Sequence, residues 1–178
     1  MQEGVRYGGR PRVSWVDGLY GGLFAGMIHA GFWIVVDALV LHDMTVSEVF
    51  TAIAAPILGS TSSALGMPAV ILGVCLHFMT AITFGFIYAW FAARIRLMTI
   101  VPFSGLFGIT YGLFVYYVMT FLVIPILHVN NVERWWAAII GHTLCYGFSL
   151  SEFITTAHKK DVQAELAEMA ELRAQSAP

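Results

Sequence analysis

Charged side chains are scarce in this sequence. Only 11% of its 178 residues are Asp, Glu, Lys or Arg, while 58% are hydrophobic and the mean hydropathy is +0.77. A soluble domain carries about 25% charged residues, so this balance excludes an ordinary water-soluble domain and indicates an integral membrane protein. The net charge of −2 leaves no basic surface to neutralise phosphates, which excludes nucleic acid as a partner.

Cysteines are few, and the common catalytic motifs are absent. Cys75 and Cys145 lie inside apolar runs, which is typical of small buried hydrophobes and not of a disulfide or a CxxC redox pair. The sequence contains no HExxH, GxSxG or P-loop motif. The first apolar run is too long for a signal peptide and lacks a cleavage site, so we expect it to remain as a helix.

Long apolar runs, in contrast, are abundant. A bilayer core requires about 20 apolar residues in a helix. Four runs meet this length and predict an all-α membrane protein with a four-transmembrane-helix bundle, with spans over residues 15–41, 69–93, 102–127 and 135–157.

Two shorter segments complete the predicted architecture. Residues 45–48 have the capping-box form, and the apolar stretch that follows is too short to span, which predicts a short interfacial or re-entrant helix. Residues 159–178 predict a C-terminal amphipathic helix that docks on this protein or on a partner. Its apolar side is formed by Val162, Leu166, Met169 and Leu172.

Basic residues in the short flanks predict the orientation. They gather in the arm of residues 1–14, between the second and third spans, and after the fourth span, at Arg6, Arg10, Arg12, Arg94, Arg96, Lys159 and Lys160. The other two loops offer only Arg134. The positive-inside rule therefore predicts both termini in the cytoplasm, for a multi-pass protein of the bacterial inner membrane.

Small residues recur at four-residue spacing in the first and third spans. Gly18, Gly22 and Gly26 form a doubled GxxxG, and Ser104, Gly108 and Gly112 repeat it. Such spacing predicts helix-packing faces, one of which we expect to serve an external partner. Gly18 matches Ser104 at an offset of 86 (104 − 18), and His77 matches His142 at 65 (142 − 77). We therefore hypothesise a duplicated helical hairpin.

One polar layer is expected near the outer side of the bundle. At about 1.5 Å per residue, Asp37, His77 and His142 all lie about 10 Å below that boundary. His29 shares a helical stripe with Asp37, and the third span brings Tyr116, Tyr117 and Thr120 to a similar level. Polar groups in lipid tend to face one another, so these residues are the candidate site.

Three interpretations of this layer remain open. The polar groups pair structurally and fix the helix arrangement. Alternatively, His77 and His142 ligate a b-type haem, or together with Asp37 they hold a divalent metal ion. In the third interpretation, Asp37 and the histidines form a relay for protons or solutes.

The second half, over residues 68–155, resembles the YagU-like group of small bacterial inner-membrane proteins of uncharacterised function. The shared pattern is a histidine in the second span with an aromatic exit, then a proline and a Gly-His pair, here at His77, Phe84, Tyr88, Pro125 and Gly141-His142. The resemblance implies a four-helix inner-membrane protein with a link to acid tolerance. The first half departs from the group's pattern.

The function expected from these features is non-enzymatic. We expect an accessory or subunit of a larger membrane assembly, whose partners are the lipid bilayer and either other membrane subunits or further copies of the chain. The alternative is a redox or ion-conducting membrane protein that uses Asp37, His77 and His142.

Overall fold

The computed structural model describes residues 13–126 and 134–176, and the described residues are helical with no strand. The predicted arm with Arg6, Arg10 and Arg12 lies outside them. Four helical stretches are long and apolar enough to cross a membrane, which confirms the all-α membrane bundle: Trp15–Val40, Met67–Ala92, Phe103–Ile126 and Trp135–Gln175.

The first span begins with α1 (Trp15–Trp33) and continues as the π-helix η1 (Ile34–Val40). A capping box opens α1, in which the Ser14 backbone N–H donates to Asp17 Oδ2 over 2.7 Å. Such a box satisfies amide groups that the first turn of a helix otherwise leaves unpaired.

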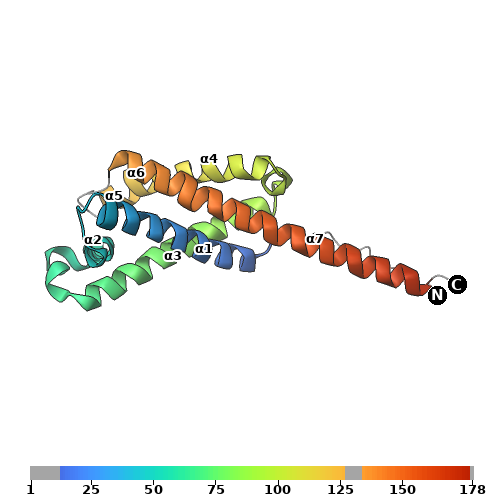
Figure 1. The fold of residues 1–178 in the computed structure, drawn as a ribbon, viewed down its shortest axis with the longest axis horizontal. Helices are drawn as coiled ribbons and strands as arrows, with labels where there is room; N and C mark the ends of the chain where they lie inside the picture. Colours follow the sequence, from blue (N-terminus) through green and yellow to red (C-terminus); the bar gives the residue numbers. More distant parts are fainter. Residues whose placement is uncertain (1–12, 127–133, 177–178) are drawn as a thin grey trace.

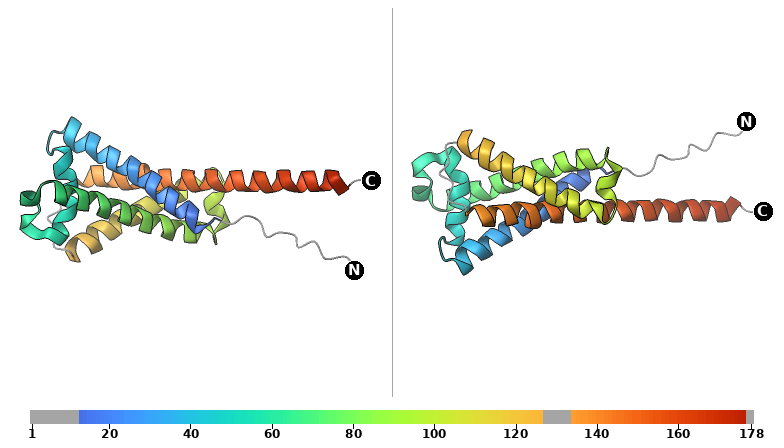
Figure 2. Two further views of the ribbon diagram at one scale, coloured as in Figure 1. Left: turned by 90° about the horizontal axis from the view of Figure 1, so that it is seen from below. Right: turned by 90° about the horizontal axis from the view of Figure 1, so that it is seen from above.

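The predicted short helix is α2 (Val46–Leu58), which begins at the expected capping box between Thr45 and Glu48. Figure 2 shows α2 lying across the end of the bundle, where it packs on α3 (Met67–Ala92). Two short 3-10 helices, η2 (Gly59–Thr61) and η3 (Ser63–Leu65), connect them.

The third span follows the 3-10 helix η4 (Arg96–Thr99). It consists of α4 (Phe103–Val118), the π-helix η5 (Met119–Val123) and α5 (Ile124–Ile126). The fourth consists of α6 (Trp135–Ile140), the π-helix η6 (Gly141–Phe148) and α7 (Ser149–Ser176).

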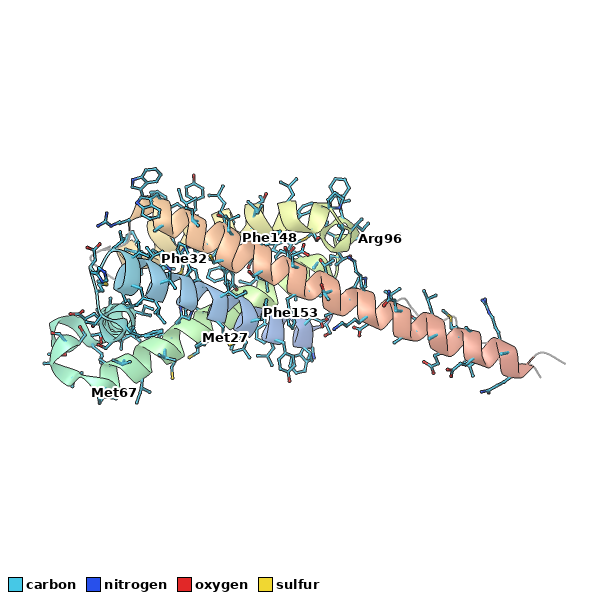
Figure 3. All side chains as sticks on the ribbon, in the orientation of Figure 1. Met27, Phe32, Met67, Arg96, Phe148 and Phe153 are labelled. Atoms are coloured by element: carbon cyan, nitrogen blue, oxygen red, sulfur yellow. The ribbon has the colours of Figure 1, made fainter. Side chains whose placement is uncertain are left out.

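The predicted C-terminal helix is present as the continuation of the fourth span, because α7 runs without a break from inside the bundle to Ser176. Its sequence contains no Gly or Pro that would end it near Lys159. The tail was expected to dock on this protein or on a partner, and it does not dock on its own bundle. The tail projects away from the other helices (Figure 1), and its side chains have no neighbouring element (Figure 3). Leu166 and Leu172 are 57% and 58% exposed.

Glycines hold each of the two hairpins together at very short range. Gly85 of α3 lies against Gly18 and Gly22 of α1, and Gly147 of η6 lies against Gly108 and Gly112 of α4. A Cβ on Gly85 would come within 2.8 Å of the Gly22 Cα, and one on Gly147 within 2.7 Å of the Gly112 Cα. Both predicted glycine faces are therefore packing faces.

Neither face is left for an external partner, contrary to our expectation. Gly26 packs on Ala81 and Phe78 of α3, in line with Gly18 and Gly22. Ser104 is fully buried, and its hydroxyl donates to Glu152 Oε1 over 3.3 Å. The close approach that glycines permit in lipid is used within this chain.

The recurring packing gives the hairpin repeat a different register from the expected one. Gly85 and Gly147 occupy equivalent places, so Gly18 corresponds to Gly108 and not to Ser104. A Cβ on Gly22 would meet the backbone of Ala81, and a Cβ on Gly112 would meet that of His142. His142 is therefore the counterpart of Ala81, and His77 is not its counterpart.

Candidate functional site: a cavity floored by three histidines

A cavity of about 500 Å³ lies in the half of the bundle that α2 covers. Its walls are mostly apolar and come from every span and from α2, with Trp33, Val49, Ile53, Leu76, Phe84, Val115, Met119 and Ile124 among the lining residues. Three histidines, Thr80 and Tyr146 supply polar groups to the lining. A volume of this size is in the range of small-molecule sites, which are about 300–1,000 Å³.

His29, His77 and His142 come together from three different spans. The centroid of the His29 ring lies 5.6 Å from that of His77, to which it is nearly parallel, and 4.6 Å from that of His142. His29 and His142 are 9% and 7% exposed. We call these three residues the histidine floor.

Hydrogen bonds set the tautomer of each ring. Nε2 of His77 lies 2.9 Å from the carbonyl oxygen of Gly26, and Nδ1 of His142 lies 2.8 Å from the carbonyl oxygen of Ala138. A carbonyl oxygen can only accept, so each of these nitrogens carries the proton. His29 Nε2 instead accepts from the Trp33 indole N–H over 3.1 Å, which places the proton of the neutral His29 ring on Nδ1.

The histidine floor therefore offers groups of both kinds. Nδ1 of His77 and Nε2 of His142 are lone-pair acceptors, and Nδ1 of His29 is a donor. Within the described part of the chain, none of these three nitrogens has a hydrogen-bond partner. The carbonyl oxygens of Gly26 and Ala138 accept from the other nitrogen of His77 and His142 and hold each ring in one orientation. Backbone carbonyls orient metal-binding histidines in the same way.

Charged groups mark the side of the cavity that reaches solvent. Arg134 Nη2 and Asp43 Oδ2 form an ion pair at 2.7 Å, and the two side chains are 50% and 47% exposed. Asp37 lines the same cavity from the π-helix η1. In a π-helix each backbone N–H donates to the carbonyl oxygen five residues earlier, so the turn contains one extra residue. Such segments are frequent at functional sites.

The predicted polar layer is only partly assembled. The group contains His29 where Asp37 was expected, since Asp37 lies two helical turns further along the first span. No three imidazole, thiol or carboxylate groups within residues 13–126 and 134–176 are placed to hold a metal ion. The predicted metal set of Asp37, His77 and His142 is thus not brought together.

A haem ligated by His77 and His142 does not fit this arrangement either. Bis-histidine ligation requires the porphyrin plane to lie between the two rings. The His29 ring packs against both, so a porphyrin between them would have to displace it. The histidines are arranged to hydrogen-bond a small group in the cavity and not to sandwich a macrocycle.

The third span contributes less than predicted. The Tyr116 ring is buried, 6.0 Å from that of His142. Tyr117 is 52% exposed and stacks on Phe121, on the outside of the bundle. Thr120 does not line the cavity.

Sequence reasoning missed Tyr146 and the covering role of α2. Tyr146 lies one turn after His142, and its hydroxyl donates to the carbonyl oxygen of Ala81 over 2.6 Å. Tyr146 lies four residues after His142 and therefore shares a helix face with it, which is the pattern in the sequence that could have identified it. Ala52, Ile53 and Pro56 show that α2 forms a wall of the cavity, which its apolar composition alone does not reveal.

Comparison of the chain with family models, with curated proteins and with solved structures gives no match. The resemblance to the YagU-like group stays a prediction. The geometry of the cavity is therefore the basis on which function is argued.

Proposed function

We propose that this chain is a non-enzymatic integral membrane protein that binds a small apolar molecule carrying a hydroxyl group. The observation that supports this is the histidine floor. It combines two unpaired acceptors and one unpaired donor at the polar part of an otherwise apolar cavity of about 500 Å³.

A hydroxyl is the smallest group that both donates and accepts. It can donate to Nε2 of His142 or Nδ1 of His77 and accept from Nδ1 of His29. Buried polar groups that stay unpaired are costly, so a ligand that pairs them gains affinity. The apolar walls, including Trp33, Phe84 and Met119, suit a hydrocarbon body such as that of a phenol or a long-chain alcohol.

The proposal retains an accessory role in a membrane assembly of the bacterial inner membrane. The support for a partner is the projecting tail of α7, where Leu166, Met169 and Leu172 are exposed on a helix that nothing in the bundle covers. Arg94 and Arg96 and the basic Lys159-Lys160 pair flank the spans on one side, whereas Arg134 on the other is paired with Asp43. This asymmetry supports a cytoplasmic tail.

The binding proposal is tested with a matched pair of probes, para-butylphenol and its methyl ether, para-butylanisole. The two have nearly the same apolar body, but the ether cannot donate. A lost hydrogen bond that leaves a buried acceptor unpaired costs about 1–3 kcal/mol. At about 1.4 kcal/mol for each factor of ten, the phenol is expected to bind roughly fivefold to a hundredfold more tightly.

Saturable binding of tritiated probe to the protein in lipid nanodiscs is the measurement, with empty nanodiscs subtracted. His142→Leu removes one acceptor and is expected to reduce the preference for the phenol, while Ala52→Trp fills the cavity and abolishes saturable binding of both probes. Tyr117→Phe, on the exposed face, is the control and keeps the wild-type preference. Equal binding of phenol and ether by the wild-type protein would refute the proposal.

The accessory role has a separate test. Native mass spectrometry of the protein released from its own membranes is expected to show a complex with another protein or with further copies. Leu166→Asp is expected to remove that association. A chain that is monomeric and free of partners under these conditions would contradict the accessory role and leave the binding proposal standing.

A further inference from the structure

A second set of polar side chains is buried in the half of the bundle from which the tail extends. Tyr88 and Ser151 are 0% exposed and Thr155 is 1% exposed. The Tyr88 hydroxyl lies beside Ser151 and the Glu152 carboxyl group. His158 follows on the same side of α7, since Ser151, Thr155 and His158 are spaced by four and three residues. We call these five residues the polar column.

Three atoms of the polar column are buried without a partner. Among the described residues, the Tyr88 hydroxyl, Thr155 Oγ1 and His158 Nδ1 make no hydrogen bond of ordinary geometry. Buried polar groups are nearly always paired, by protein or by ordered water. Three such atoms on α3 and α7 leave hydrogen-bonding capacity that ordered water would satisfy.

Two tyrosines connect the polar column with the histidine floor. The Tyr146 ring lies 6.2 Å from that of His29, and the Tyr111 ring lies 5.0 Å from that of Tyr88. Tyr146 donates to the carbonyl oxygen of Ala81 and Tyr111 to that of Phe84, each over 2.6 Å. Ala81 and Phe84 lie three residues apart on α3, which is a rise of about 4.5 Å.

Polar groups consequently follow one another through the whole membrane-spanning part of the bundle. From the solvent side of the cavity the order is Asp37, the histidine floor, Tyr146, Tyr111, Tyr88, Ser151 with Glu152, Thr155 and His158. Polar residues at bilayer depth are costly, and those that face the bundle interior commonly mark routes for protons. Association of the helices alone does not require polar side chains along the whole length of the bundle.

We propose that the polar column and the histidine floor together form a proton-conducting route across the membrane. A proton enters as hydronium at His158, where its O–H bond breaks as an N–H bond forms at Nδ1 and water is released. Bound water passes the proton along Thr155, Ser151 and Tyr88, with each oxygen accepting one proton and releasing another. From Tyr88 the proton passes to the Tyr111 and Tyr146 hydroxyls, each of which accepts it and releases its own proton after turning away from the carbonyl oxygen of Phe84 or Ala81. It then binds the free lone pair of His77 or His142 and is released to water in the cavity, so charge and atoms balance without a redox partner.

Glu152 is the one carboxyl group facing this part of the route among the described residues. Its Oε1 accepts from Ser104, which holds it on the route. Charged residues at this side of the bundle include Asp17 in the first turn of α1, Arg94 and Arg96 between α3 and α4, and Lys159, Lys160 and Asp161 on α7. The carboxyl group gives a proton a favourable binding place within the route.

The test is proton flux into liposomes that contain the full chain. A potassium gradient with valinomycin supplies the driving potential, and pyranine inside the vesicles reports pH. We expect wild-type flux well above that of protein-free vesicles. Tyr88→Phe removes only the hydroxyl, Thr155→Val replaces the hydroxyl by a methyl group of similar size, and each is expected to lower the flux at least tenfold. Glu152→Gln is expected to lower it as well.

Tyr117→Phe is the matched control, because it removes a tyrosine hydroxyl from the exposed face and is expected to conduct as the wild type does. Circular dichroism and elution volume establish that each variant is folded. Wild-type flux equal to that of empty vesicles would overturn the proposal, as would unchanged flux in folded Tyr88→Phe and Thr155→Val. The phenol-binding assay is independent, because Thr155 lies outside the cavity lining.

Discussion

Replacement of Gly85 by alanine provides a quantitative test of how the two helices of the first hairpin are packed. The new Cβ would lie 2.8 Å from the Gly22 Cα and 3.0 Å from the Gly22 N, besides meeting the Gly18 carbonyl oxygen. These are backbone atoms, which cannot rotate away as a side chain can. Ordinary Cβ contacts begin at 3.4 Å, so α1 and α3 must separate by at least 0.6 Å (3.4 − 2.8).

The separation has an energetic cost that can be bounded. A radial gap of about 0.5–1 Å already forfeits a quarter to a half of each dispersion contact along an interface. Overpacking of well-packed sites typically costs about 1–3 kcal/mol. The same shift would stretch the 2.9 Å hydrogen bond between His77 and the Gly26 carbonyl to the limit of such bonds. We therefore expect Gly85→Ala to lower the free energy of unfolding by about 1–3 kcal/mol.

Gly31 is the matched control in the same hairpin, since a Cβ added there would meet nothing within 4 Å. Alanine is favoured over glycine in a helix by up to about 1 kcal/mol, so Gly31→Ala is expected to be neutral or stabilising. The assay is reversible unfolding in mixed detergent micelles, followed by circular dichroism. The packing described above is refuted if both variants have the same free energy of unfolding within about 0.5 kcal/mol.

Three further predictions concern α2, the tail and the solvent side of the cavity. Hydrogen bonds from Thr45 to the Glu48 carboxylate hold the pKa of Glu48 below its ordinary value. The capping box therefore stabilises α2 above the ordinary pKa of glutamate and loses this effect as the pH falls through the lowered one. Hydrogen exchange of the first amides of α2 should rise in acid, and Thr45→Ala should remove this pH dependence; exchange independent of pH after correction for the intrinsic rate would contradict it. Leu166→Asp should change the free energy of unfolding by less than about 0.5 kcal/mol, because the side chain has no neighbour in the bundle; a larger loss in micelle unfolding would show that the tail does dock. Arg134→Met should cost at most about 1 kcal/mol, since its ion pair with Asp43 is half exposed, and a loss of several kcal/mol in the same assay would refute that view.

The main elements of the fold were predictable because they follow from local composition. The four apolar runs and the Thr45–Glu48 capping box are readable from consecutive residues, and both are present. The packing role of Gly18, Gly22 and Gly26 also follows from their spacing. The spacing does not identify the helix that packs on this face, because a glycine face fits another helix of the same chain as well as a helix of another protein.

The spacing of the contacts within the second hairpin was not predictable, because the π-helix η6 inserts an extra residue. Ala81 and Gly85, which contact Gly22, are four residues apart, whereas His142 and Gly147, which contact Gly112, are five apart. Nothing in the composition of residues 141–148 indicates this insertion. The wrong counterpart of His142 has another cause. The histidines were matched by residue type at an offset of 65 (142 − 77), whereas the packed positions Ala81 and His142 differ by 61 (142 − 81).

The candidate site was partly predictable for a similar reason. His77 and His142 were expected to meet, and they do so through His29, whose ring contacts both. Depth counted along straight helices favoured Asp37 over His29, because it ignored the crossing of helices and the π-helix η1. The tautomers depend on the carbonyl groups of Gly26 and Ala138, which only the packed structure places beside the rings.

Nitrogen-15 magnetic resonance of histidine-labelled protein in nanodiscs tests the central claim most directly. Three neutral rings are expected in the histidine floor, with the proton on Nε2 in His77 and on Nδ1 in His29 and His142. Single replacements of each histidine assign the signals. Addition of para-butylphenol should shift the unprotonated nitrogen of His77 or His142, while para-butylanisole should leave both unchanged. Reversed tautomers, or a histidine floor that responds to neither probe, would contradict the account.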